Sequence, residues 1–207
     1  MGDGPTTLLI CCGAVAKEIV ALVEDNNWAN IHTTCLPAHL HNTPERIPEG
    51  VRDKIRAARD SYDRILVLYG DCGTGGLLDR VLAEEGVSRI GGSHCYEVFA
   101  GADKFDALMK TEPGSFFLTD FLARHFDRLV IEGLGLDRFP ELRKTYFGRY
   151  KRVVYLAQSD DPDLEAKAKA AAKSLGLDYE RRYTGYGDFE KFVASNRGCG
   201  TVEPAVQ

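Results

Sequence analysis

Short apolar runs alternate with amphipathic stretches along almost the whole chain. The runs typical of strands include TLLICC, ILVLYG and RVVYLAQS, and amphipathic segments such as 161–176 lie between them. That segment begins with Asp161-Pro162 and ends at Gly176, which are standard signals for the start and end of a helix. Strands that alternate with helices build βαβ units around a parallel sheet. The alternation therefore predicts a three-layer α/β fold with a mostly parallel sheet.

The length of 207 residues suits one domain with a real hydrophobic core. We therefore predict a single α/β domain over 1–207, with a flexible tail from about 197 to 207. The middle of the chain is predicted to be rich in helix from about Thr119 onward. Its aromatic residues are interpreted as core: Phe116, Phe117, Phe121 and Phe126.

Charge and hydropathy exclude several classes of protein. The net charge is -5 and no basic stripe with interleaved aromatic residues is present, which argues against a nucleic-acid partner. No apolar run is long enough to cross a bilayer, and the N-terminus lacks the basic region of a secretory signal. We expect a cytoplasmic protein that acts on a small-molecule substrate, without a membrane or nucleic-acid partner.

Four of the six cysteines follow or close predicted strands. In a parallel sheet, the carboxyl ends of the strands meet at one edge, where ligands bind. If the strands before Cys12 and Cys72 are neighbours, the two thiols face each other, Cys95 lies beside Cys72, and Cys35 lies on the far side of Cys12. We expect Cys12, Cys72 and Cys95 to converge, with His94 or Cys35 as a further member. Cys11 and Cys199 are not part of this set.

This set of side chains has the chemistry of a soft metal site. Three protein ligands with an open position are typical of catalytic zinc, and three thiolates could equally hold an iron–sulfur cluster with one open iron. We therefore predict that Cys12, Cys72, His94 and Cys95 bind zinc or an iron–sulfur cluster. No Cys-x-x-Cys pair supports this hypothesis.

The segment YGDCGTGG allows a second interpretation without metal. Cys72 would lie in a glycine-rich turn before a helix, where free N–H groups bind anions and lower the pKa of a thiol. Cys72 could then be a nucleophile with His94 as base and Asp71 or Asp120 as the residue that orients it. The same turn predicts that Gly73, Thr74 and Gly75 contact a cofactor or anion.

Other polar residues are candidates from their position alone. Glu97 follows Cys95 by two residues and would share its side of an extended chain, as a candidate acid or base. His39 and His41 would point to opposite sides of an extended segment, so only one of them could face a site. Further candidates, each as easily explained by packing or an ordinary surface position, are Asp120, Asp137, Arg138, Tyr146 and Tyr186.

Several long motifs carry a resemblance to a known family. The segments CLPAHLHNTPERIP, YGDCGTGG, GSHCYEVFAG, GSFFLTDFL and GLGLDRFPELRKTYFGRY resemble the domain-of-unknown-function family 1638, over about residues 9–192. The family carries no established activity. The residues that match its motifs and can perform chemistry are Cys12, Cys72, His94, Cys95, Glu97, Asp120, Asp137, Arg138 and Tyr146.

The resemblance also implies a metabolic setting. Members of the family accompany corrinoid-dependent methylamine or betaine methyltransferase systems, which implies one-carbon metabolism with a corrinoid protein or methyltransferase as partner. Three hypotheses follow: a metal-dependent enzyme or methyl-transfer component, a metal-free accessory module that binds a small anion or a corrinoid protein, and a Cys72 nucleophile that acts as transferase or hydrolase.

Overall fold

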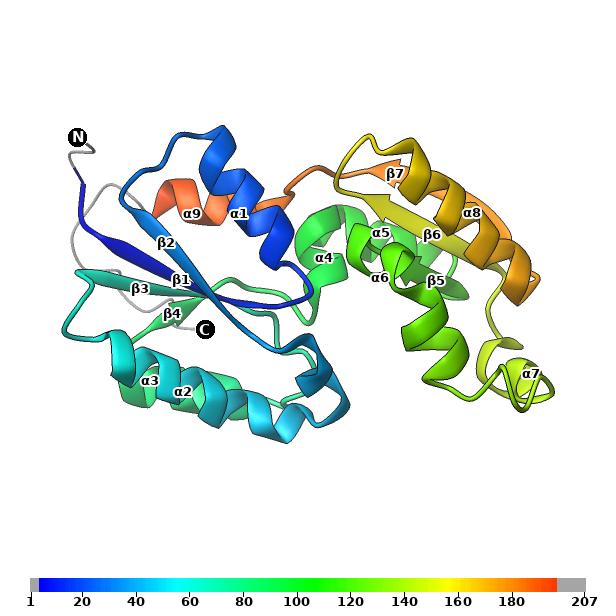
Figure 1. Ribbon diagram of the computed structural model, residues 1–207, viewed down its shortest axis with the longest axis horizontal. Helices are drawn as coiled ribbons and strands as arrows, with labels where there is room; N and C mark the ends of the chain where they lie inside the picture. The colour runs from blue at the N-terminus through cyan, green and yellow to red at the C-terminus, as the bar shows by residue number, and fades with distance from the viewer. Residues whose placement is uncertain (1–3, 197–207) are drawn as a thin grey trace. The chain divides into compact units, whose positions relative to one another are not determined.

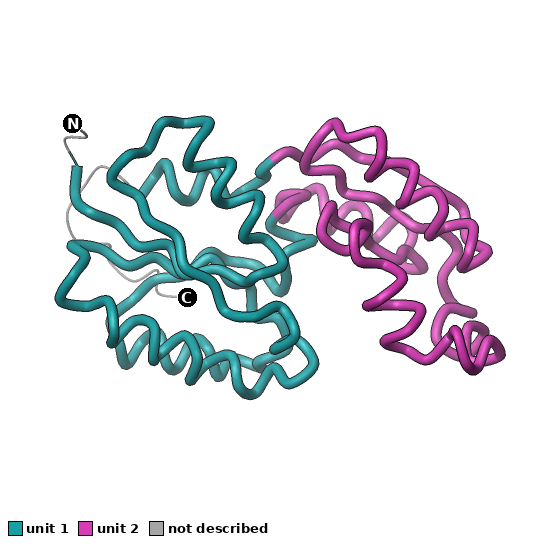
Figure 2. Tube along the Cα trace, in the orientation of Figure 1, with its two compact units in different colours: residues 1–98, 186–207 teal, residues 99–185 magenta. Residues whose placement is uncertain are grey.

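The computed structural model describes residues 4–196, which form two compact units (Figure 2). Unit 1 comprises Met1–Val98 and Tyr186–Gln207, and unit 2 comprises Phe99–Gly185. Each unit has its own parallel sheet, so the α/β class and the parallel strands are confirmed, but one continuous sheet is not what forms. That the whole chain behaves as one domain stays a prediction. The expected tail and Cys199 lie outside the described residues.

Unit 1 is built on a four-stranded parallel sheet with the order β2-β1-β3-β4. The strands are β1 (Thr7–Cys12), β2 (Ile31–Leu36), β3 (Arg64–Leu68) and β4 (Ser88–Arg89). All six residues of β1 are buried, because helices cover both of its faces. In Figure 1, α1 (Ala16–Asp25) and α9 (Asp188–Ser195) lie on one face of this sheet, and α2 (Ile47–Ala58) and α3 (Leu77–Glu85) lie on the other. The unit therefore has three layers.

The chain reverses its direction of travel across this sheet between β1 and β3. It first moves outward from β1 to β2 and then crosses back to β3 and β4. Such a reversal is a topological switch point, where the loops after neighbouring strands diverge and leave room for a ligand. Two short 3₁₀ helices follow β2 on the way to α2: η1 (Ala38–Asn42) and η2 (Pro44–Arg46).

Unit 2 contains a three-stranded parallel sheet with the order β5-β6-β7. Its strands are β5 (Ser115–Leu118), β6 (Arg152–Ala157) and β7 (Asp178–Tyr183). The helices are α5 (Ala102–Thr111), α6 (Asp120–Arg124), the π-helix η3 (Asp127–Glu132), α7 (Leu142–Phe147) and α8 (Pro162–Leu175). The predicted start and end signals of α8 are confirmed: the Asp161 side chain accepts from the N–H groups of Asp163 and Leu164, and Gly176 adopts φ 72°.

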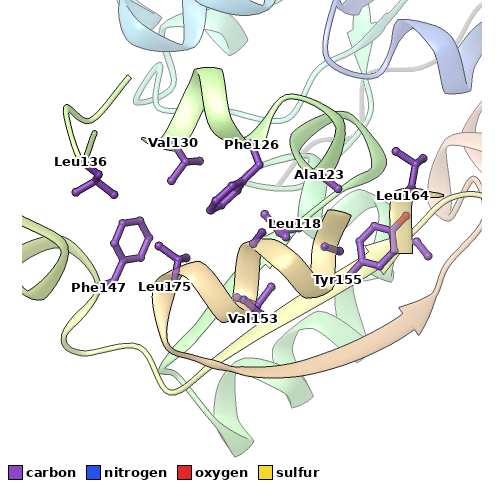
Figure 3. Packing of buried hydrophobic residues seen from close by; sticks show 14 residues of the cluster. Leu118, Ala123, Phe126, Val130, Leu136, Phe147, Val153, Tyr155, Leu164 and Leu175 are labelled. Carbon is purple, nitrogen blue, oxygen red and sulfur yellow. The ribbon is translucent and has the colours of Figure 1, made fainter. Parts of the chain in front are cut away.

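One apolar cluster holds α6, η3, α7 and α8 of unit 2 to its sheet. Figure 3 shows Leu118 of β5 and Val153 and Tyr155 of β6 packed against helix residues that include Phe126 and Leu175. Phe117 is also buried, and Phe116 packs edge-on against Phe147 with ring centroids 5.2 Å apart. The prediction that these aromatic residues belong to the core is therefore confirmed for Phe117 and Phe126, which are buried.

Three local features differ from what the sequence predicted. The residues Phe116 and Phe117 belong to a strand, β5, which the sequence analysis did not recognise before the helix at Thr119. The segment around Cys95 was expected to be extended, but β4 spans two residues and Cys95 begins the helix α4 (Cys95–Ala100). Glu97 therefore lies on a helix, where residues two apart point to different sides. Similarly, His39 and His41 lie on η1 rather than on an extended segment.

Candidate functional site

The carboxyl edge of the unit 1 sheet gathers four candidate side chains from different loops. Cys12 is the last residue of β1, and Cys72 follows β3, the strand next to β1. Cys95 begins α4 after β4, on the other side of β3. His41 comes from η1, which follows β2. The predicted neighbourhood of Cys12 and Cys72 at the switch point is thus confirmed by the strand order.

His41 lies between the two thiols of the switch point. Its Nδ1 atom is 3.7 Å from Sγ of Cys12 and 3.0 Å from the carbonyl oxygen of Ala38. The Cys72 side chain, by hydrogen bonding to the imidazole, is the main cause that raises the pKa of His41, and burial opposes it. We refer to these residues as the Cys12–His41–Cys72 group, because the imidazole contacts Cys12 and Cys72 is near enough to act on the pKa of that imidazole.

Cys72 has an uncommon backbone conformation. Its φ angle is 50°, in the left-handed region that L-residues other than glycine rarely adopt. Gly73, Gly75 and Gly76 follow with φ angles of 84°, 61° and 80°. A residue held in this region costs free energy, so the surrounding contacts must impose the conformation, and such positions cluster at functional sites.

Asp71 imposes much of that conformation. Its carboxylate accepts hydrogen bonds from the Thr74 hydroxyl at 2.8 Å and from the backbone N–H groups of Gly75 at 3.2 Å and Gly76 at 2.9 Å. These bonds, led by the one from Gly76, lower the pKa of Asp71. The carboxylate thus occupies the N–H groups that would otherwise bind an external anion before α3. An anion or cofactor at Gly73, Thr74 and Gly75 stays a prediction, and these contacts do not favour it.

A second loop holds the Cys72 turn from the side of β4. The N–H groups of Asp71 and Cys72 donate to the carbonyl oxygens of Gly92 at 3.0 Å and Ser93 at 2.7 Å. A Cβ atom at Gly70 would lie 2.9 Å from the backbone of His94, so only glycine allows the two loops to approach this closely. The loop that carries Cys95 is therefore fastened directly to the loop that carries Cys72.

The thiols of Cys12 and Cys95 are set in surroundings that favour the neutral form. Burial is the largest cause that raises the pKa of each thiol. The negative charges that Cys72 and Cys12 would carry as thiolates raise the pKa of Cys95 further. A hydrogen bond at 3.2 Å from the Ala14 N–H group to Sγ of Cys12 acts in the opposite direction.

Tyr69 adds a polar group that the sequence analysis did not single out. The side chain is 2% exposed, and its hydroxyl group lies near enough to the Cys12 thiol for a hydrogen bond between them to raise the pKa of Tyr69 and to lower that of Cys12. Burial, followed by the charge of a Cys12 thiolate, raises the pKa of Tyr69. A buried hydroxyl group beside Cys12 can donate to its sulfur atom, which satisfies a polar group that water does not reach.

His94 and Glu97 have clear structural positions beside this group. The carbonyl oxygen of His94 accepts from the N–H groups of Glu97 and Val98 at the start of α4, and its ring lies 5.3 Å from that of Tyr96. The Glu97 carboxylate accepts from the Ser93 N–H group at 2.8 Å and from the Ser93 hydroxyl at 2.7 Å. The Ser93 hydrogen bonds lower the pKa of Glu97, so this carboxylate stabilises the loop as an anion.

The described residues 4–196 contain no group of three or more His, Cys, Asp or Glu side chains arranged to hold a metal ion. The donor set nevertheless has the right chemistry, because thiolates and imidazole are the ligands of zinc. Binding of a metal by Cys12, Cys72 and Cys95 would therefore require side-chain rotation, with His41 as the histidine beside Cys12.

In unit 2, Asp120 is a buried carboxylate with a complete set of hydrogen bonds. Oδ1 accepts from the Tyr155 hydroxyl at 2.7 Å and the Gln158 N–H group at 3.0 Å. Oδ2 accepts from the Ser159 N–H group at 3.0 Å and its hydroxyl at 2.6 Å. These contacts join the start of α6 to the end of β6, so they explain Asp120 as a structural residue of unit 2.

The remaining candidates lie at exposed or partly exposed positions. Asp137 and Arg138 form an exposed ion pair at 3.9 Å, a type of contact that contributes little free energy. The Arg138 guanidinium lies 5.9 Å from the centre of the Phe139 ring. Tyr146 of α7 is 46% exposed. Tyr186, in unit 1, hydrogen bonds to Asp25 at 2.5 Å. Catalytic roles for these residues stay predictions.

None of the described helices is long and apolar enough to span a bilayer. No curated protein and no solved structure was found to match the chain. Residues 35–193 match the family described as protein of unknown function (DUF1638), which is more than half of the sequence. The matched region includes His41, Cys72 and Cys95, whereas Cys12 precedes it. The chain therefore belongs to the DUF1638 family.

Proposed function

We propose that unit 1 performs group transfer through the sulfur atom of Cys72, with His41 as its general base, on a small electrophilic substrate. The observation that carries this proposal is the placement of His41 beside Cys72 with its ring held by the Ala38 carbonyl oxygen. A nucleophile, an adjacent base and a group that orients the base are the arrangement by which proteins activate thiols.

The orientation of His41 decides which ring nitrogen can act. A carbonyl oxygen only accepts hydrogen bonds, so Nδ1, at 3.0 Å from Ala38, carries the hydrogen. In the neutral ring, Nε2 then has the lone pair that can accept the proton of Cys72. The sulfur would attack the electrophilic carbon, and the leaving group would depart with its bonding electrons and take the proton from His41. Water or a second acceptor would then release the group from Cys72.

The test is alkylation of the reduced full chain with iodoacetamide, followed by mass spectrometry of the tryptic peptide 65–80, whose sole cysteine is Cys72. We expect Cys72 to react faster than the exposed Cys35, and His41→Gln to lower the Cys72 rate about tenfold, because the thiolate loses its imidazolium partner. His39→Gln, on the same turn η1, is the matched control and should leave the rate unchanged. An unchanged rate in His41→Gln would refute the pairing.

A second candidate function is metal or cluster binding, favoured by the positions of Cys12, Cys72 and Cys95 at or after the ends of three neighbouring strands, β1, β3 and β4. The ligands would be these three cysteines with His41, or with His94 as the sequence suggested, around zinc or an iron–sulfur cluster. The corrinoid-linked one-carbon setting, with a corrinoid protein or methyltransferase as partner, belongs to this candidate and rests on the family resemblance.

Metal analysis of protein purified without air separates the two candidates. Bound zinc would protect the three thiols from iodoacetamide, and Cys72→Ser would lower the metal content, whereas Cys35→Ser would not. A brown protein would indicate an iron–sulfur cluster. A colourless, metal-free protein with a fast-reacting Cys72 supports the nucleophile, and equal metal content in the wild type and Cys72→Ser excludes Cys72 as a ligand.

A further inference from the structure

A second pair of thiols lies in unit 1, apart from the Cys12–His41–Cys72 group. Cys11 of β1 and Cys35 of β2 are register partners on neighbouring parallel strands. Register partners in a parallel pair point to the same face of the sheet, and neighbouring strands are about 4.8 Å apart. Disulfides join cysteines whose Cα atoms are about 4.4–6.8 Å apart, so this placement is within the range of a covalent link. Both cysteines are free thiols in the structure.

The pair faces away from Cys12. Successive side chains of a strand point to opposite faces, so Cys11 and Cys12 project to different sides of β1. On the side of Cys12, its register partner Leu36 contacts Gly50 of α2, where a Cβ atom would lie 2.5 Å from Leu36 Cδ2. On the other side, the buried Glu18 of α1 is one of the charged groups that act on Cys11. The two groups of thiols are therefore separated by the thickness of the sheet.

The two members of the pair differ in access to solvent. Cys35 is exposed on β2, the edge strand of the sheet, whereas Cys11 is 1% exposed. Burial, and next the charge of a Cys35 thiolate, raise the pKa of Cys11 to about 12. An exposed thiol that meets reagents first, beside a buried thiol that can reach only its neighbour, is the arrangement of an attacking and a resolving cysteine.

We propose that Cys35 is a site of thiol modification, at which a low-molecular-weight disulfide is captured and then resolved by Cys11. The Cys35 thiolate attacks one sulfur of the reagent, the reagent's S–S bond breaks, and one thiolate leaves. The Cys11 sulfur then attacks Cys35 Sγ and displaces the second thiolate, which takes up the proton that Cys11 loses. The two protein thiols are oxidised to a Cys11–Cys35 disulfide, and the reagent is reduced to two thiols.

The product links β1 to β2 one residue before Cys12, at the edge where the candidate site lies. Because Cys11 is buried and slow to ionise, the mixed disulfide at Cys35 forms first and the internal disulfide follows more slowly. The inference depends on the register of β1 and β2 and does not require the proposed role of Cys72.

The experiment treats the reduced full chain with oxidised glutathione and follows intact mass and non-reduced tryptic peptides over time. Trypsin places Cys11 and Cys12 together in peptide 1–17 and Cys35 in peptide 18–46. The wild type should first gain one glutathionyl group on 18–46 and then lose it as 1–17 and 18–46 become joined. Cys35→Ser should show neither event on these peptides.

The variants Cys11→Ala and Cys12→Ala show which of the two thiols displaces glutathione from Cys35. The Cys35 adduct should persist in Cys11→Ala, with at least about tenfold less cross-link than in the wild type, because the resolving thiol is absent. Cys12→Ala should form the cross-link as the wild type does. Persistence of the adduct in the wild type, or a cross-link that survives Cys11→Ala, would overturn the proposal. Protein unfolded in urea provides the reference for pairing without the sheet.

Discussion

The Sγ atom of Cys12 lies 3.7 Å from Nδ1 of His41, the ring nitrogen that also lies 3.0 Å from the Ala38 carbonyl oxygen. Both the sulfur atom and the carbonyl oxygen can accept the hydrogen of Nδ1, and the carbonyl oxygen cannot donate one. The end of β1 and the turn η1 after β2 thus select one tautomer of a histidine, although 29 positions separate Cys12 from His41 along the chain.

The tautomer of His41 can be measured directly. We expect nitrogen NMR shifts of the neutral protein to show the hydrogen of His41 on Nδ1, both in the wild type and in Cys12→Ala, because the Ala38 carbonyl oxygen remains as acceptor. His39, exposed on the same turn, serves as the reference and can be assigned with His39→Gln. A hydrogen found on Nε2 of His41 would remove the proton acceptor that the proposed chemistry requires.

The left-handed conformation of Cys72 predicts an inverted response to glycine. Cys72→Gly should be about 1 kcal/mol more stable than Cys72→Ala in chemical denaturation, because glycine adopts φ 50° without the penalty of a Cβ atom. At Cys35, within β2, the order should reverse, with Cys35→Gly less stable than Cys35→Ala by about 0.5–1 kcal/mol. If Cys72→Ala were as stable as Cys72→Gly or more stable, Cys72 would not be strained.

Asp71 should contribute to stability in a defined range of pH. Its pKa is lowered in the folded protein, so the folded state binds fewer protons than the unfolded state in acid. The stabilisation is therefore complete above the unfolded pKa, about 3.9, and is lost as the pH falls through the folded pKa. Unfolding free energies of Asp71→Asn should fall less steeply with acid than those of the wild type. Asp53→Asn, at an exposed position of α2, is the control, and its unfolding free energy should fall with acid as steeply as that of the wild type.

The hydrogen bonds of Asp120 predict a large effect on the stability of unit 2. Asp120→Ala should lower the free energy of unfolding by about 3 kcal/mol, because Tyr155, Gln158 and Ser159 would keep buried donors without an acceptor. Tyr155→Phe should cost about 1 kcal/mol, and the double variant should cost less than the sum. Asp127→Ala, at an exposed position of η3, should stay within about 0.5 kcal/mol of the wild type. A small loss in Asp120→Ala would favour a functional role for this carboxylate instead.

Local pattern was sufficient for most of the elements. The fully apolar run of β1 and the helix signals of α8, Asp161-Pro162 and Gly176, depend on neighbours in the sequence. The strand β5 was not recognised because Ser115–Leu118 is short and only Thr119 and Asp120 separate it from the apolar residues of α6. The helix α4 at Cys95 was not predicted because its start depends on long-range contacts. Ser93 hydrogen bonds to Glu97 of α4, and the loop that contains Ser93 is held by backbone hydrogen bonds to the turn after β3.

The sequence by itself determined the α/β class, the parallel strands and the positions of Cys12 and Cys72 at or after strand ends, because periodicity and strand ends are local properties. The two thiols were expected to meet only if these strands were neighbours, which the strand order of the folded sheet decided. Only the tertiary structure decided that the strands form two sheets. It also placed His41 beside these thiols, with its imidazole ring hydrogen bonded to the Ala38 carbonyl oxygen. It also decided that the glycine-rich turn is filled by its own Asp71. Such outcomes depend on which loops are brought together in space, and the long-range contacts that bring them together leave no periodic trace in the sequence.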